Sequence, residues 1–318
     1  MIKKIFSKII NIFVKNLLNK LLERFNYLII FRNGSAIGDH IYMSSIIREI
    51  FLNHNKKILL FSNYYEFYLN NPRIYLLFRP NKKSLIWFFL KNLKGKSILE
   101  FDSLFSHQSK EKHFLYYHKK KIHLAEAMSQ HFNLKINYKS LKNEIFFTNE
   151  EIKKYENDLN LPKDFALIHS TSKKTFTKNK EWKVEGMQEI VNYFLNLNWI
   201  QLGKSNEPRL RNCKHLFDLD FRKVAYVVSR CSFLVTYEGF FNHIASCFEK
   251  KNFLIHVGFL PEESFFYKNN IVIENNKNIK CYPCYYLHCE NHRKLSKNLL
   301  NESFVIKKIE DNLNIISK

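Results

Sequence analysis

Two successive series of short apolar runs, each alternating with helical patterns, constrain the fold of this chain more than any other feature. Four strand-like runs fall in the first half, at Tyr27–Phe31, Lys57–Phe61, Ser97–Phe101 and Glu144–Phe147. Helical patterns lie between them, at Ile41–Leu52, Ser84–Leu93 and Ile122–Phe132. Alternation of this kind predicts a parallel sheet with right-handed crossovers, whose ligands bind beyond the carboxyl ends of the strands.

The second half repeats the alternation. Its strand-like runs are Phe165–His169, Trp199–Leu202 followed by Gly203, Phe233–Thr236 and Phe253–Val257. Its helical patterns are Val184–Leu197, Arg222–Ser229 and Phe241–Phe248, with further helices expected over Leu295–Ile316. Between the halves, Thr148 and Glu151 have the spacing of a capping box, which predicts another helix start. We therefore expect a segment of residues 1–26, a first domain over 27–160 and a second over 161–318.

Charge and composition narrow the class of partner. With 46% apolar and 25% charged residues, the 318-residue chain is globular, and its net charge of +22 predicts acidic partners. Anionic lipid and phosphorylated or carboxylated substrates rank above nucleic acid, because no arginine-rich recognition helix, zinc-finger spacing or RRM-like motif occurs. The chain contains no run of 18 apolar residues, so no membrane span is predicted. The six cysteines do not suggest a disulfide scaffold, so we expect a reducing cytoplasm.

Residues 1–25 form a strongly amphipathic helical pattern. Apolar residues recur every four positions from Ile5 to Phe25, and lysines interrupt the apolar region, which excludes a secretory signal. The pattern predicts a helix on an anionic membrane surface. The alternative is an N-terminal helix packed on its own domain.

The turn after the first strand-like run concentrates two of the chain's seven glycines. Gly34 and Gly38 let the backbone turn sharply and come close to a ligand, and Asp39 follows at a helix start. A carboxylate there either acts on the ligand or caps the helix. The G-x-G-x-x-G fingerprint is absent, so no nicotinamide or flavin site is predicted.

The stretch from Phe165 to Trp182 predicts an anion cradle. Its strand opens into Ser170, Thr171 and Ser172 and then into lysines that include Lys180, ahead of a helix. Hydroxyls, loop N–H groups, a helix N-terminus and a lysine together suit a phosphate. The alternative is a solvated basic loop.

A second group of polar residues follows the strand that ends at Thr236. Glu238 lies at the carboxyl end of that strand, and His243 falls near the first turn of the next helix. We expect both to face the same crevice as the anion cradle, where a carboxylate accepts hydrogen bonds from sugar hydroxyls. The alternative is a helix cap and a structural histidine.

These motifs resemble, in order, those of the heptosyltransferase family, glycosyltransferase family 9. The family's glycine turn, G-D and helix correspond to Gly38 and Asp39 before Ile41. Its strand, histidine, hydroxyls and K-x-W correspond to five residues, which are His169, Thr171, Ser172, Lys180 and Trp182. Its acidic E-G-G-x-x-H variant corresponds to Glu238–His243, and its C-x-P-C to Cys281–Cys284. Two positions depart from the pattern, with Ser45 in place of a proline and Phe240 in place of a glycine.

The resemblance implies a GT-B fold, in which two Rossmann-like domains with parallel sheets face a central cleft. It also implies inverting, metal-independent transfer of a sugar, ADP-heptose being the donor of the best-known members, onto a lipopolysaccharide-type acceptor. Asp39 would be the base beside Gly38. The donor-binding residues would be Gly38, Thr171, Ser172, Lys180, Glu238, Gly239 and His243. The protein would be cytoplasmic, peripheral on the inner face of a bacterial inner membrane, with no cofactor.

Two groups remain open to more than one interpretation. The basic residues Lys119, Lys120, Lys121 and His123 either bind acceptor anions or form a solvated face. The cysteines Cys281, Cys284 and Cys289 leave zinc open, but a second C-x-x-C is missing and we expect reduced structural thiols. Rival functions are an inactive membrane-bound scaffold of this fold, which Ser45 and Phe240 would favour, and a GT-B enzyme with another nucleotide sugar.

Overall fold

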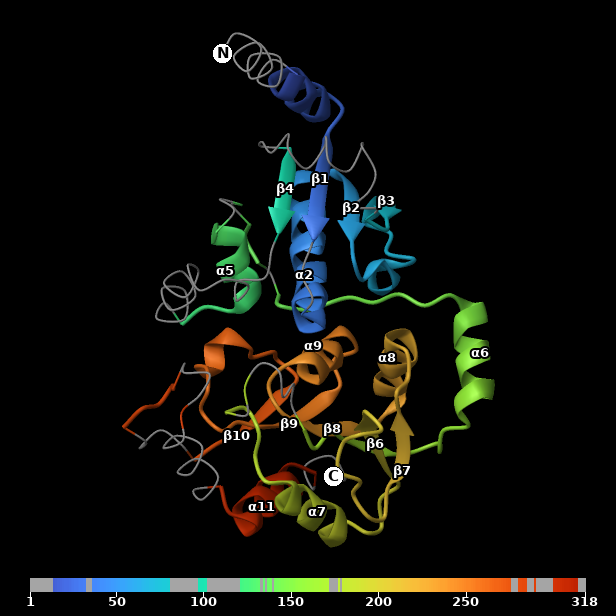
Figure 1. Ribbon diagram of the computed structural model, residues 1–318, viewed down its shortest axis with the longest axis vertical. Coiled ribbons are helices and arrows are strands. Elements are labelled where there is room, and N and C mark those ends of the chain that lie inside the picture. The colour runs from blue at the N-terminus through green and yellow to red at the C-terminus, as the bar shows by residue number, and fades with distance from the viewer. Residues whose placement is uncertain are drawn as a thin grey trace. The chain divides into compact units, whose positions relative to one another are not determined.

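The computed structural model divides the chain into two compact units, drawn in Figure 1. It describes residues 14–32, 36–80, 97–101, 121–131, 134, 136–138, 140–171, 177, 179–275, 280–284, 289 and 300–313. Unit 1 comprises Met1–Phe114 and Leu124–Phe147, and unit 2 comprises Leu115–His123 and Thr148–Lys318. The helix that starts after Thr148 thus belongs to unit 2, where we had expected it to close the first domain.

Unit 1 is built on a parallel sheet in the strand order β3-β2-β1-β4. Its strands are β1 (Tyr27–Arg32), β2 (Lys57–Ser62), β3 (Ile74–Phe78) and β4 (Ile98–Phe101). Its helices are α2 (Ile37–His54), the short 3-10 helix η1 (Tyr65–Tyr68) and α5 (Leu124–His131). The helix expected over residues 84–93 lies outside the described residues.

Two strand predictions for unit 1 were wrong. Residues 144–147 form no strand, because side chains rather than a ladder hold them: Glu144 pairs with Arg73 at 2.8 Å, and its N–H donates to the Ser44 hydroxyl at 2.9 Å. Strand β3 was missed because its half-exposed residues follow no alternation that marks a buried face. The unit 1 sheet therefore contains an unpredicted strand, β3, which pairs with β2.

Helical residues 14–24 precede β1 and have two apolar stripes. Val14, Leu18 and Leu22 pack against the cluster of Ile29, Phe31 and Ile98 in unit 1. The other stripe is exposed, with 48% of Leu17, 40% of Leu21 and 56% of Phe25 open to solvent. Residues 1–13 lie outside the described residues. Among the helices that the structure describes, none has the length and apolarity needed to cross a membrane.

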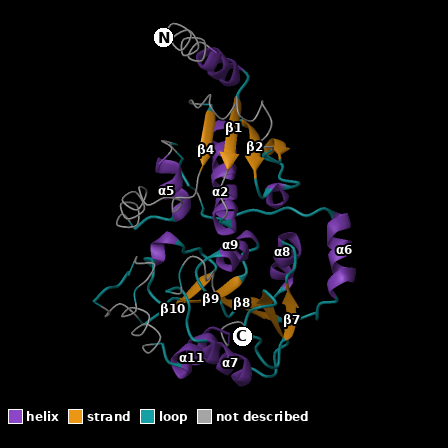
Figure 2. Ribbon diagram, viewed as in Figure 1, coloured by secondary structure: helices purple, strands orange, loops and turns teal. Residues whose placement is uncertain are grey.

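Unit 2 holds a larger parallel sheet in the strand order β10-β9-β8-β5-β6-β7. Its strands are β5 (Ala166–Ile168), β6 (Trp199–Gly203), β7 (Lys214–Phe217), β8 (Phe233–Thr236), β9 (Lys251–Ile255) and β10 (Asn270–Ile273). Its helices are α6 (Asn149–Leu159), α7 (Val184–Tyr193), α8 (Phe221–Arg230), α9 (Phe240–Cys247), the 3-10 helix η3 (Glu262–Ser264) and α11 (Glu302–Leu313). Figure 2 shows the two element types by colour. The edge strands β7 and β10 were not predicted.

Local chemistry explains the ends of several of these elements. The capping box of Thr148 and Glu151 is present at the start of α6, as predicted. Helix α7 ends at Tyr193, short of the expected Leu197, because the chain turns there through a bond from the Leu197 N–H to the Phe194 carbonyl. The expected C-terminal helix corresponds to α11.

The core of unit 2 joins its sheet to α7 and α11. Trp182 is fully buried and donates its indole N–H to the Leu300 carbonyl at 2.7 Å. A Cβ at Gly186 would lie 2.4 Å from the Trp182 ring, so only glycine lets α7 pack this closely on the indole. The segment that carries Lys180 is therefore anchored immediately after that lysine.

Candidate functional site

Lys180 and Glu238 form an ion pair at the carboxyl edge of the unit 2 sheet. Lys180 lies in the segment after β5, and Glu238 follows β8, the strand paired with β5. The Lys180 Nζ lies 2.9 Å from the Glu238 Oε1, and the two side chains are only 16% and 3% exposed. The two residues that the sequence predicted at one crevice are thus brought together.

Three further residues extend this ion pair across the ends of β9 and β10. The second oxygen of Glu238 lies 3.8 Å from the Nε2 of His256, which follows β9. The Nδ1 of His256 lies 2.9 Å from the Oε2 of Glu274, which follows β10. That same oxygen accepts the hydroxyl of Tyr282 at 2.9 Å. Sequence reasoning missed these residues, although His256 and Glu274 each follow an apolar run as Glu238 does.

Thr171 contributes a buried hydroxyl at the end of β5. The residue is 4% exposed, and its Oγ1 has no hydrogen-bond partner among the described residues. A buried polar group without a partner costs free energy that a bound ligand can offset. The neighbouring Ser170 hydroxyl, by contrast, accepts a bond from Gln201 at 3.1 Å. Ser172 lies outside the described residues.

The turn between Glu238 and α9 is made by one glycine. Gly239 has φ +134°, a conformation that side chains rarely adopt, and is the N-cap residue of α9. Phe240 is the first helical residue, so the departure from the family's second glycine leaves the turn intact. No side chain caps α9, whose first N–H groups and dipole suit an anion.

His243 and His123 share a buried environment around Tyr267. The Nδ1 of His243 lies 2.6 Å from the Tyr267 hydroxyl, and the His123 ring packs edge-on against Tyr267 at 4.8 Å. Burial lowers the pKa of His123 to about 3, and burial, His123 and Lys180 together hold the pKa of His243 well below its usual value. Both rings are neutral at physiological pH. A buried, neutral His123 does not supply the cation that its predicted acceptor role would use, and that role stays a prediction.

Of the predicted basic run, the structure describes only Lys121 besides His123. Lys121 is exposed, which agrees with a solvated face. Lys119 and Lys120 lie outside the described residues.

Asp39 pairs with a buried arginine in unit 1. It is the third residue of α2, beside Gly38, and its Oδ2 lies 3.3 Å from an Nη of Arg32, the last residue of β1. Arg32 is fully buried and Asp39 is 7% exposed. The N-cap of α2 is Ala36, which makes no side-chain cap, so the alternative that Asp39 caps this helix was wrong. Sequence reasoning missed Arg32, whose only signal is its place at a strand end.

Polar contacts hold the neighbourhood of Asp39 in place. The Tyr68 hydroxyl donates to the His40 carbonyl at 2.7 Å, and the Nδ1 of His40 lies 3.1 Å from the Ser62 hydroxyl. All three residues are buried, and burial raises the pKa of Tyr68 far above its usual value. The first turn of α2 is therefore fixed to the carboxyl end of β2 and to η1.

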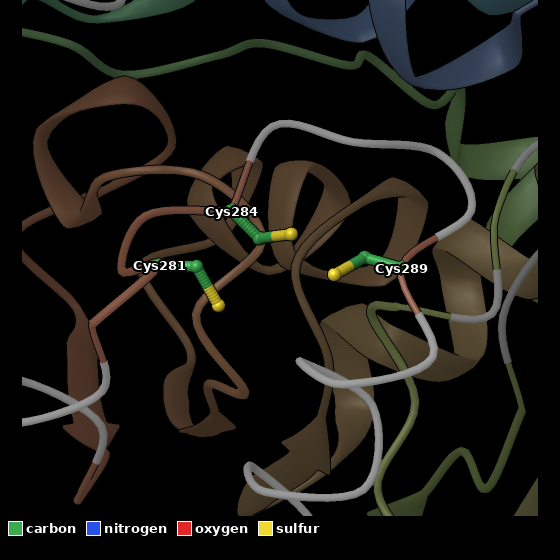
Figure 3. A group of neighbouring side chains, drawn as sticks. All are labelled: Cys281, Cys284 and Cys289. Carbon is green, nitrogen blue, oxygen red and sulfur yellow. The ribbon is translucent and has the colours of Figure 1, made fainter.

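The three cysteines near the end of unit 2 lie together, as Figure 3 shows. The Sγ atoms of Cys281, Cys284 and Cys289 are all within 4.8 Å of one another. The sequence predicts reduced structural thiols here and leaves zinc open, and the structure brings the three thiols together.

Comparisons with known proteins relate this chain to others by fold. No family model matches the sequence, and no curated protein matches it. Solved structures do match over nearly the whole chain. A glycosyl transferase family 9 protein from Veillonella parvula aligns with a TM-score of 0.61 at 15% identity, over 90% of this chain and 97% of that one.

Two Escherichia coli structures give the same result. The iron-containing dodecameric glycosyltransferase TibC has a TM-score of 0.66 at 11% identity, over 92% of this chain and 77% of its own. The heptosyltransferase WaaC, solved with ADP, has a TM-score of 0.55 at 11% identity, over 89% of this chain and 99% of its own. The chain therefore has the GT-B fold of the heptosyltransferase-like family 9 glycosyltransferases.

Proposed function

We propose that the chain is an inverting glycosyltransferase that moves a sugar from a nucleotide-diphospho donor, with ADP-heptose as the first candidate. The shared fold supports this assignment. TibC has been solved with ADP-D-beta-D-heptose and WaaC with ADP, so both fold relatives bind an adenine nucleotide.

The ion pair of Lys180 and Glu238 is the observation that carries the proposal. A diphosphate needs a cation, and a sugar needs an acceptor for its hydroxyls. Both groups lie at the carboxyl edge of one sheet in unit 2. At the same edge, no described residue bonds the Thr171 hydroxyl or caps the start of α9. On donor binding, Lys180 would turn to the diphosphate and Glu238 to the sugar.

Asp39 would supply the general base for the acceptor hydroxyl. An inverting displacement needs a group that removes the hydroxyl proton as the leaving diphosphate departs. An Nη of Arg32 lies 3.3 Å from the Asp39 Oδ2, beside the carboxylate that would accept the proton. The departing diphosphate would be met by Lys180, so we propose that transfer needs no divalent ion and no cofactor.

The acceptor would be a lipid-linked, anionic saccharide at the inner face of a bacterial inner membrane. The exposed stripe of Leu17, Leu21 and Phe25 supports membrane contact, with the basic residues Lys20 and Arg24 also exposed on the same helix. Tyr27, Tyr75 and Lys57 contact one another nearby, where β1, β2 and β3 begin. Tyrosine and lysine of this kind are typical of an interface between water and lipid.

The test is a binding panel of ADP, GDP and UDP followed by a release assay. We expect ADP to bind most tightly, and ADP-heptose with a lipooligosaccharide acceptor to release ADP at a rate unchanged by added Mg²⁺ or Mn²⁺. A preference for GDP or UDP would assign the other donor class. Binding of none of the three would contradict the proposal and favour the scaffold.

The two departures from the family pattern do not favour the scaffold. Ser45 lies inside α2 and donates its hydroxyl to the Tyr42 carbonyl at 2.7 Å. Phe240 begins α9 after a turn that Gly239 makes alone. Both charged pairs, Arg32 with Asp39 and Lys180 with Glu238, are present with these substitutions in place.

A further inference from the structure

Three thiols converge in unit 2, from residues 280–284 and 289, which form no helix or strand. Cys284 is buried, and Cys281 and Cys289 are half-buried. Figure 3 shows the side chains of Cys284 and Cys289 directed toward each other, with Cys281 beside them. Within the part of the chain that the structure describes, this is the one group of three histidine, cysteine or acidic side chains with metal-ligand spacing. Of the other cysteines, Cys213 directly precedes β7, Cys231 is the C-cap residue of α8 and Cys247 ends α9.

The spacing fits a shared metal ion better than a disulfide. A tetrahedral ion with metal–sulfur bonds of about 2.3 Å separates its thiolates by about 3.8 Å. The three Sγ atoms, all within 4.8 Å of one another, reach that spacing by small side-chain rotations. A disulfide would join two of the three sulfurs and leave the third thiol beside the bond. The C-x-x-C spacing of Cys281 and Cys284 also matches the usual ligand pair of a thiolate site.

The backbone around the thiols is fixed at two points. The N–H of Cys284 donates to the Gly258 carbonyl at 2.9 Å, just beyond β9. The hydroxyl of Tyr282, between the two cysteines, donates to Glu274 beyond β10. Two of the ligand positions are therefore held in place by contacts other than the metal, which reduces the ordering cost of binding.

We propose that Cys281, Cys284 and Cys289 bind one structural transition-metal ion of the kind that thiolates prefer, zinc or iron. The thiols lose their protons on binding, and the three thiolates occupy three positions of a tetrahedral site. The fourth position takes water or another side chain. The ion cross-links Cys289 to Cys281 and Cys284 within the segment after β10, and the bond from the Cys284 N–H to Gly258 ties that segment to the loop after β9.

This cross-link also affects the proposed nucleotide site. That second inference rests on the proposed function. Tyr282 lies between two of the metal ligands and bonds Glu274, Glu274 contacts His256, and His256 faces Glu238. The ion thus holds a series of contacts that positions the Glu238 carboxylate. Tyr282, Glu274 and His256 are positioning residues in this arrangement.

The test of the metal site is elemental analysis of the full chain, purified without chelator or affinity metal. We expect about one zinc or iron per chain, and iron is distinguished by its visible absorption. Substitutions Cys281→Ser, Cys284→Ser and Cys289→Ser should each remove most of the metal, whereas Cys213→Ser, at a half-buried single thiol, should keep it. Metal-free protein, equal metal content in all four variants, or a disulfide within the trio would overturn the proposal.

A second measurement tests the metal site without substitutions, in case the serine variants do not fold. In the unaltered chain, the bound ion should protect three thiols from alkylation until a strong chelator removes it, and the modified residues can be identified by mass spectrometry. Cobalt added to the stripped chain should give thiolate charge-transfer absorption. If the three thiols react at the same rate with and without chelator, no ion is bound there.

The consequence for the nucleotide site is tested separately. Stripping the metal should weaken ADP binding roughly tenfold, as loss of supporting contacts commonly does, and reloading should restore it. Tyr282→Phe should weaken binding in the same direction while the metal content stays unchanged. If the metal is present but ADP does not bind at all, the proposed function fails and the metal site stands.

Discussion

The Nζ of Lys180 lies 2.9 Å from a carboxylate oxygen of Glu238, so the two charges that would serve the donor neutralise each other before it binds. Glu238 is almost fully buried, and a buried carboxylate that loses its partner is costly. Lys180 therefore has two separable roles, one in stability and one in diphosphate binding.

Lys180→Ala should weaken both properties, and a double variant separates them. Loss of a charge-assisted hydrogen bond predicts ADP binding weaker by about 1.5–3 kcal/mol. Lys180→Ala also leaves Glu238 with its charge unpaired, so its melting temperature should fall. In Lys180→Ala/Glu238→Gln the buried charge is gone, so stability should recover while ADP affinity stays low. Calorimetric titration and thermal denaturation measure the two effects. Wild-type ADP affinity in Lys180→Ala would contradict the assignment.

Asp39→Asn should abolish most turnover without weakening ADP binding. General-base help is worth about 10²- to 10⁴-fold in rate, and asparagine cannot take the acceptor proton. Because Asp39 is not the cap of α2, its substitution leaves the helix start unchanged. The matched control is Glu66→Gln on η1, which removes a carboxylate paired with the exposed Arg79. Turnover of Asp39→Asn within a few-fold of the parent would exclude the base role.

The sequence predicted most of the fold because hydrophobic periodicity marks buried strands and helices. It predicted β5, β6 and β8 within one residue at each end, since these strands are buried on both faces. It missed β3, β7 and β10, which lie at the edges of the two sheets. Edge strands have exposed faces, and their residues therefore do not follow a continuous apolar run.

The candidate site was predicted only where polar residues form a motif in the segment after a strand. Lys180 and Glu238 were both singled out, and the structure pairs them. Arg32 and His256 were not, because a single charged residue at a strand end has no pattern until the partner is known. His243 was placed in the site, although its contact with Tyr267 depends on a residue 24 positions away that no local pattern marks.

Acidification should destabilise the protein through His123 and His243. The pKa of His123 is about 3 in the folded state and about 6.5 in the unfolded chain, so the unfolded chain binds the additional proton between these values. Stability is thus fully present above pH 6.5 and is lost as pH falls toward 3. The contribution of His123 is about 1.4 kcal/mol per pH unit within that window, and His243 acts in the same direction.

The variant His123→Phe tests this origin of the pH dependence. Phenylalanine keeps the edge-on packing against Tyr267 and removes the titrating group. Urea denaturation between pH 6 and pH 4 should show a slope smaller by about 1.4 kcal/mol per pH unit than that of the parent. The exposed His54, replaced by Gln, is the control and should leave the slope unchanged. An unaltered slope in His123→Phe would show that this ring is already protonated or exposed.

The two stripes of helical residues 14–24 should separate membrane binding from folding. Leu17, Leu21 and Phe25 are 48%, 40% and 56% exposed, so serine at all three removes exposed apolar surface. If lipid covers this surface, the loss is about 3 kcal/mol, or roughly 100-fold in binding to vesicles with anionic lipid. The melting temperature should stay close to that of the parent.

Two controls distinguish a loss of membrane binding from a loss of stability. Leu18→Ser and Leu22→Ser alter the stripe that packs on Ile29, Phe31 and Ile98, and should lower stability instead. Leu195→Ser removes a leucine that is 61% exposed in unit 2 and should change neither property. Because both stripes lie on one helix, deletion of residues 1–25 would confound the two effects. Equal vesicle binding by the parent and the triple serine variant would exclude this face as the membrane contact.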